Sequence, residues 1–96
     1  MTFRIYVDDN FNYMDESSRY CIGKFENFDE AVARCKSIVD EFLIEHNTDQ
    51  IDAESLLKLY TMFGEDPFVV PTPESETSFS AWGYAKQRCE ELCRVN

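Results

Sequence analysis

The chain has 96 residues, of which 19 are acidic and 9 are basic, so its formal net charge is −10. This length predicts a single domain over residues 1–96, and a hydrophobic content of 44% excludes a disordered tail. Such a charge repels phosphate backbones and anionic lipids, so we expect no nucleic acid and no membrane as partner; it either serves solubility alone or favours a basic protein partner.

The first predicted elements are two strands. FRIYV at 3–7 places Phe3, Ile5 and Val7 in alternation with polar residues, which is the period of a half-buried strand. RYCIGKF at 19–25 has the β-rich composition of a second strand. We expect the two strands to pair antiparallel, with a polar connection between them.

A helix over residues 28–45 is predicted to follow at once. Asn27 is its expected N-cap, and Glu30 stands three residues later, as in a capping box. Apolar residues at spacings of three and four form one stripe, made of Phe28, Ala31, Val32, Cys35, Ile38, Val39, Phe42 and Leu43. We therefore expect this helix to form the centre of the core.

A second helix is predicted between Asp52, as its N-cap, and Gly64, as a left-handed C-cap. Its apolar residues are expected to face the core. They are Leu56, Leu57, Leu59, Tyr60 and Phe63.

A short buried strand is predicted at 68–70, between Pro67 and Pro71, because proline cannot donate to a strand ladder and suits strand ends. Ser80 is the expected N-cap of a last helix. Its predicted buried stripe consists of Trp82, Ala85, Cys89, Leu92 and Cys93. The order ββααβα predicts an α+β fold, with three helices packed on one face of a small, mainly antiparallel three-stranded sheet.

The stretch DDNFNY at residues 8–13 begins like a calcium-binding loop, with Asp or Asn at the first, third and fifth ligand positions. However, Tyr13 stands where the sharp turn requires glycine, and Arg19 stands where a bidentate glutamate is required. We expect no calcium here.

Phe11 and Tyr13 of this stretch have two interpretations. Either they fold inward as a continuation of the first strand, or they stand exposed among acidic residues as anchors for a basic partner. In the second case the acids steer the partner and the rings supply buried area.

The remaining polar residues form no obvious catalytic or metal site. His46 lies eleven residues after Cys35 on the same helix, about 16 Å along its axis and too far for a Cys–His pair. We interpret His46 as a group that caps the C-terminus of the helix. Cys89 and Cys93 lack the tight spacing of structural zinc ligands, so we expect both thiols in the core, no metal and no cofactor.

Among the adjacent carboxylates, only Glu65 and Asp66 have aromatic neighbours that could raise the pKa of a carboxyl group. The plainer interpretation of this pair is a turn that precedes Pro67.

The amino-terminal residues MTFRIYVDD show no basic region followed by an apolar one, and no apolar run approaches the ~20 residues that a membrane span needs. We therefore expect a cytoplasmic protein. Its four cysteines would then be reduced thiols, most of them buried.

Three segments, FDEAVARCKSIVDEFL, LYTMFGEDPF and FSAWGYAKQRCEELC, carry a resemblance that covers nearly the whole chain. Together they resemble a domain of unknown function of about 100 residues found in small bacterial proteins. The resemblance implies a bacterial source and a compact α+β fold. It implies no activity.

The leading functional hypothesis is a cytoplasmic protein-interaction or regulatory module, because a small acidic chain rich in aromatics and without a catalytic constellation suits a binding surface. The alternative is a small enzyme or ligand-binding protein that uses the FGEDPF turn and the last helix. The candidate residues of that second site are Glu65, Asp66, Trp82, Tyr84 and Arg88. A monomer and a homodimer both remain open.

Overall fold

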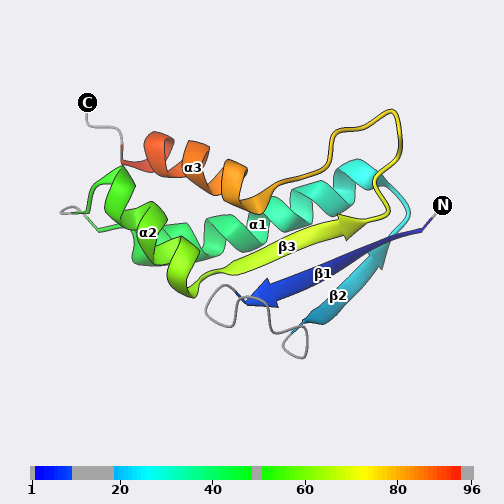
Figure 1. Ribbon diagram of the computed structural model, residues 1–96, viewed down its shortest axis with the longest axis horizontal. Helices are drawn as coiled ribbons and strands as arrows, with labels where there is room; N and C mark the ends of the chain where they lie inside the picture. The colour runs from blue at the N-terminus through cyan, green and yellow to red at the C-terminus, as the bar shows by residue number, and fades with distance from the viewer. Residues whose placement is uncertain (1, 10–18, 49–50, 94–96) are drawn as a thin grey trace.

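The computed structural model describes residues 2–9, 19–48 and 51–93. Its elements are β1 (Phe3–Asp9), β2 (Tyr20–Phe25), α1 (Phe28–His46), α2 (Ala53–Phe63), β3 (Glu65–Val70) and α3 (Ala81–Leu92). The predicted α+β fold and the order ββααβα are confirmed (Figure 1). None of the helices in these ranges combines the length and the apolar character that crossing a bilayer requires.

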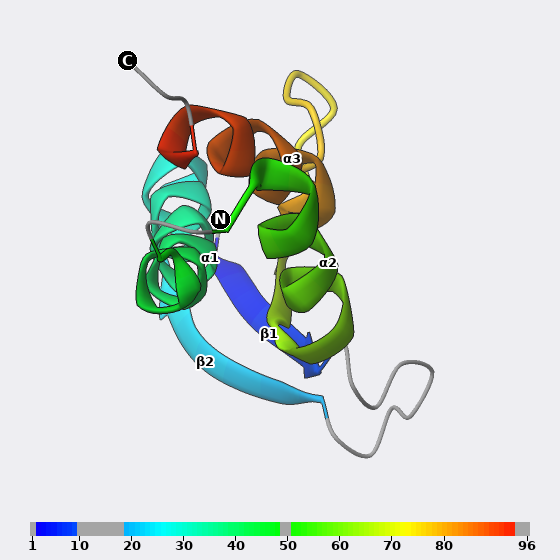
Figure 2. The ribbon, with the colours of Figure 1, turned by 90° about the vertical axis from the view of Figure 1, so that its left-hand side faces the viewer.

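The sheet is antiparallel, with β1 in the centre and β2 and β3 at the edges. All three helices lie on the same side of it, so none of the described helices covers its opposite face, which we call the open face (Figures 1 and 2). The alternation in β1 explains this arrangement: Phe3, Ile5 and Val7 are buried toward the helices. Tyr6, on the open face, stacks on Phe68 of β3 with ring centroids 6.0 Å apart.

The core consists of two clusters that α1 joins. The first lies between the sheet and the beginning of α1, and consists of Phe3, Ile5, Val7, Phe28, Ala31, Cys35 and Val69. The second lies where the end of α1 meets α2 and α3, and consists of Val39, Leu43, Leu56, Tyr60, Ala81, Ala85 and Cys89. Phe79 packs against both clusters. The long helix thus holds the sheet and the other two helices together, as its apolar stripe predicts.

Each helix begins at the predicted cap. The Asn27 side chain accepts hydrogen bonds from the backbone N–H groups of the first turn of α1, at 2.8 and 3.3 Å. Asp52 accepts from the N–H of Ser55 at 2.7 Å, and Ser80 accepts from the N–H of Gly83 at 3.1 Å. These bonds satisfy donors that the helix itself leaves unpaired.

Gly64 corrects one prediction. Its φ is −78°, so it is not the left-handed cap expected from the sequence. The reason for glycine here is space: a Cβ atom would lie 2.5 Å from Cδ1 of Tyr60 and 2.8 Å from the carbonyl oxygen of the same residue. The buried tyrosine ring occupies the volume that any side chain would need.

We expect Gly64→Ala to lower the free energy of unfolding by about 1–3 kcal/mol, because the added methyl group forces Tyr60 or the backbone to move. Denaturant unfolding of the variant measures this loss. Gly83→Ala is the control, since its Cβ would meet nothing closer than 3.3 Å; equal stability of both variants would contradict the crowding at Gly64.

Several burial predictions are also wrong. Phe63 and Trp82 are 50% and 42% exposed, although both were expected to face the core. Ile38 is only partly buried.

The bounds of β3 also differ from the prediction, because β3 begins at Glu65 and includes Pro67, which was expected to stand before the strand. Pro67 is tolerated there because β3 is an edge strand, where a missing N–H need not break a ladder.

Candidate functional site

A cavity of about 400 Å³ lies where the free edge of β3 meets the first turn of α3. Its walls are Asp66, Phe68, Phe79, Ser80, Ala81 and Trp82. The FGEDPF turn and the last helix, which the sequence predicts to form one site, thus contribute to the same cavity. Of the candidate residues predicted for that site, Asp66 and Trp82 line the cavity.

Asp66 is the ionisable residue of this cavity. Burial, with a further contribution from the Asp8 carboxylate, raises the pKa of Asp66 to about 6. Within residues 2–9, 19–48 and 51–93, no group donates a hydrogen bond to its carboxyl and no cation pairs with it. A half-buried carboxylate without a donor is energetically unfavourable.

Four carboxylates meet at this end of the sheet, which we call the acidic end: Asp8, Asp9, Glu65 and Asp66. The strand register places Asp8 opposite Asp66 and Asp9 opposite Glu65. Like charges directly opposite each other destabilise an antiparallel pair. The fold therefore concentrates negative charge here against its own stability.

Arg19, which precedes β2, and Tyr20, the first residue of β2, bind two of these carboxylates. Arg19 holds the carboxylate of Asp8 with two bonds, from Nε to Oδ1 at 2.7 Å and from Nη2 to Oδ2 at 3.2 Å. The Tyr20 hydroxyl donates to the Glu65 carboxylate. Burial and this hydrogen bond raise the pKa of Tyr20 to about 12. Among the described residues, none makes either kind of contact with Asp66.

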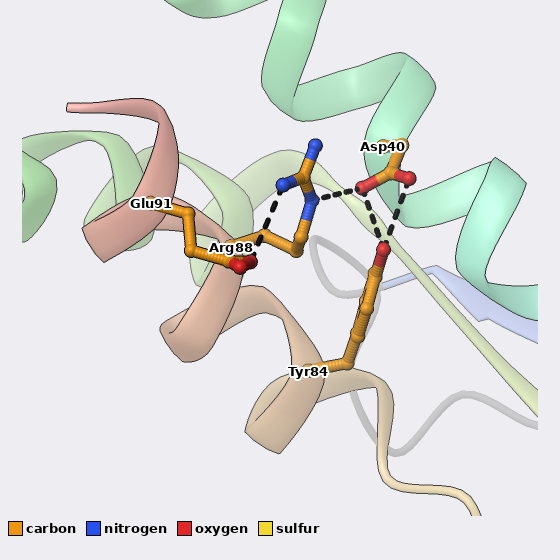
Figure 3. A network of polar contacts seen from close by, with 4 residues as sticks. All are labelled: Asp40, Tyr84, Arg88 and Glu91. Atoms are coloured by element: carbon orange, nitrogen blue, oxygen red, sulfur yellow. Dashed lines mark hydrogen bonds and ion pairs between the residues drawn. The ribbon is translucent and has the colours of Figure 1, made fainter. Parts of the chain in front are cut away.

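Tyr84 and Arg88 lie in a separate network that joins α3 to α1 (Figure 3). The Tyr84 hydroxyl lies 3.0 Å from each carboxylate oxygen of Asp40, and Arg88 Nε donates to Asp40 Oδ1 at 2.9 Å. Arg88 also donates to Glu91 at 3.2 Å. Burial and the Asp40 hydrogen bond raise the pKa of Tyr84 to about 12. These polar groups are engaged in packing two helices together, so they do not converge on the cavity.

The thiols and the histidine offer little chemistry. All four cysteines are free. Cys35 and Cys89 are buried as expected, Cys93 is only partly buried against the second cluster, and Cys21 is exposed, so the expected burial holds fully for two of the four thiols. Burial raises the pKa of Cys35 to about 12 and that of Cys89 to about 11, which leaves both as unreactive thiols at neutral pH. His46 Nδ1 lies 2.9 Å from the carbonyl oxygen of Phe42, as a capping group at a helix C-terminus should.

In the part of the chain that the structure describes, no three His, Cys, Asp or Glu side chains are arranged to hold a metal ion. Phe11 and Tyr13 lie outside the described residues, so their two interpretations remain predictions.

Two aromatic residues of the cavity, Phe68 and Phe79, were not among the candidate residues, although the sequence holds a signal for each. Phe68 stands two residues after Asp66 in a strand, so the two share a face. Phe79 precedes the N-cap Ser80, and its ring lies 6.0 Å from that of Tyr84, which is the pairing of a hydrophobic staple. The staple fixes Phe79 as a wall of the cavity.

Comparison of the chain with protein-family models, with curated proteins and with solved structures gave no match. The cavity and the acidic end are therefore the features of the molecule that indicate its function.

Proposed function

We propose that the protein is an interaction module that binds a basic segment of another protein, at the surface formed by the cavity and the acidic end. The observation that carries this proposal is the composition of the cavity, which combines three aromatic rings with a carboxyl that has no donor among the described residues. Aromatic walls supply buried area, and a carboxylate that no described residue pairs with supplies selectivity for a cation.

The charge of the molecule supports the same partner. A net charge of −10 attracts basic segments over long distances and raises their rate of association. The acidic end provides the local target, because Asp9 and Glu65 face each other across the strands next to Asp66. Trp82, whose side chain is 42% exposed, is of the residue type most often found to dominate binding energy at interfaces.

A selection from random twelve-residue peptides tests this function. We expect the selected peptides to carry net positive charge, and we expect their affinity to fall as NaCl rises, since exposed charges are screened. The double variant Asp9→Asn/Glu65→Gln should bind them more weakly. The matched control is Glu30→Gln/Glu45→Gln, which removes the same charge from exposed positions on α1.

Neutral or acidic selected peptides would contradict the proposal, as would equal weakening by the two double variants. Melting temperatures of all variants identify any loss of binding that comes from unfolding.

A second candidate function is a small enzyme or ligand-binding protein that uses the same cavity. The observation that favours it is the pKa of Asp66, about 6, which is suitable for a general acid near neutral pH. The peptide selection separates the two functions, because a site for a small neutral substrate gives no preference for basic peptides.

A further inference from the structure

We infer that the cavity between β3 and α3 holds the guanidinium group of one arginine in the partner's basic segment, with Asp66 as its counter-charge and the aromatic walls stacked on its plane. This inference depends on the proposed function, and it names the side chain that the module recognises.

The molecule already contains one guanidinium bound in this way. The guanidinium carbon of Arg19 lies 5.1 Å from the centre of the Phe68 ring, while its nitrogen atoms hold the carboxylate of Asp8 with two bonds. An aromatic ring and a carboxylate on neighbouring strands thus bind an arginine on the open face of the sheet. This internal site shows the chemistry at Phe68, which is also a residue of the cavity.

The cavity places a second carboxylate near Phe68. Asp66 lies directly opposite Asp8 in the strand register and also lines the cavity with Phe68. Phe79 and Trp82 add further rings. Asp8 is paired with Arg19, whereas no described residue supplies an arginine to Asp66. A cation from another molecule would therefore complete the arrangement at Asp66.

Arginine suits this cavity better than lysine does. A guanidinium group is planar, stacks on aromatic rings, gives up its hydration more readily than an ammonium group, and can donate two parallel hydrogen bonds to one carboxylate. The first turn of α3 contributes a partial positive charge of about half a unit, which opposes any cation. The full charge of Asp66 exceeds it, and Ser80 already caps the N–H of Gly83.

The test uses three synthetic peptides, acetyl-Gly-Ser-Xaa-Ser-Gly-amide, in which Xaa is arginine, lysine or citrulline. Citrulline keeps the shape of arginine but carries no charge. Binding is followed at pH 7.5 in ¹H–¹⁵N spectra of the full chain, where Trp82 is the only tryptophan and its indole N–H reports on the cavity. We expect the arginine peptide to bind most tightly, and citrulline about tenfold more weakly or worse.

Variants of Asp66 and Trp82 show whether the peptides bind in the cavity. Asp66→Asn should weaken the arginine peptide about tenfold and leave citrulline unchanged, while Trp82→Ala should weaken both. Glu45→Gln, which removes an exposed charge far along α1, should change neither affinity. The arginine peptide should also lose affinity below pH 6, as Asp66 takes up a proton, and Asp66→Asn should abolish this pH dependence.

With the peptides, any of the following would overturn the inference: citrulline binding as well as arginine, unchanged affinity in Asp66→Asn, or spectral changes away from the cavity. Tighter binding of free methylguanidinium than of the arginine peptide would also overturn it, since the site would then be one for a small cation. If basic peptides are selected but Asp66→Asn binds them normally, the proposed function stands and only the role of the cavity fails. If no basic peptide binds, the proposed function itself fails.

Discussion

Leu43→Ala is expected to lower the free energy of unfolding by about 3–5 kcal/mol. Leu43 is fully buried in the cluster where α1 meets α2 and α3. Truncation removes apolar contacts and leaves a cavity that surrounding helices cannot fill without moving. The same cluster packs α3 against α1, so the loss of stability also affects the helix that contributes Ala81 and Trp82 to the cavity.

The neighbouring residue provides a matched control. Ile44 is 60% exposed, so Ile44→Ala removes a side chain of equal size from the same helix turn without creating a cavity. Its expected loss is below about 0.5 kcal/mol, as for most surface positions. Urea unfolding of both variants by circular dichroism measures the difference. Similar losses at both positions would show that helix propensity, not burial of Leu43, determines the effect.

Most of the fold could be predicted because local rules agree with one another along the chain. The caps Asn27, Asp52 and Ser80 mark three helix starts, and the alternation in β1 assigns a buried face to the sheet. The errors have a common cause. Phe63 and Trp82 have helical spacing and apolar rings, but spacing places a residue on a stripe and does not reveal how wide the buried part of that stripe is.

The site was only partly predictable because it depends on strand register. The sequence shows that Asp66 has aromatic neighbours, and the structure places Asp66 and Trp82 in one cavity. That Asp66 lies opposite Asp8 follows from the pairing of β1 with β3, segments more than fifty residues apart. Likewise, nothing on the polar face of α1 distinguishes Asp40 from its acidic neighbours, because Tyr84 and Arg88 reach it only through helix packing.

The repulsion at the acidic end leads to the second large effect. Asp66→Asn is expected to raise the free energy of unfolding at pH 7.5, since the variant keeps the shape of the side chain and removes a half-buried charge that faces Asp8. A pKa raised from 3.8 to about 6 corresponds to ~3 kcal/mol for a fully enclosed group. Partial exposure of Asp66 screens this cost, so we expect a gain of about 1 kcal/mol.

The sign of the pH dependence follows from proton linkage. Between pH 3.8 and about 6, folded Asp66 retains a proton that the unfolded chain has released, so its contribution to stability falls as pH rises through this window. The Asp8 carboxylate, which Arg19 holds, contributes to the raised pKa of Asp66, and burial keeps the Cys35 thiol neutral. Wild type and Asp66→Asn should therefore be equally stable below pH 4 and differ fully above pH 6.

Chemical unfolding of both proteins at pH 4, 5, 6 and 7.5 measures this difference, with Glu45→Gln as a control for the loss of one exposed charge. A difference that does not depend on pH, or a variant less stable at pH 7.5, would mean that Asp66 is satisfied in the folded protein. A gain confined to higher pH would show instead that the fold retains a carboxylate at the cost of its own stability. Natural sequences commonly accept such a cost where a residue serves binding, and an arginine bound to Asp66 would remove it.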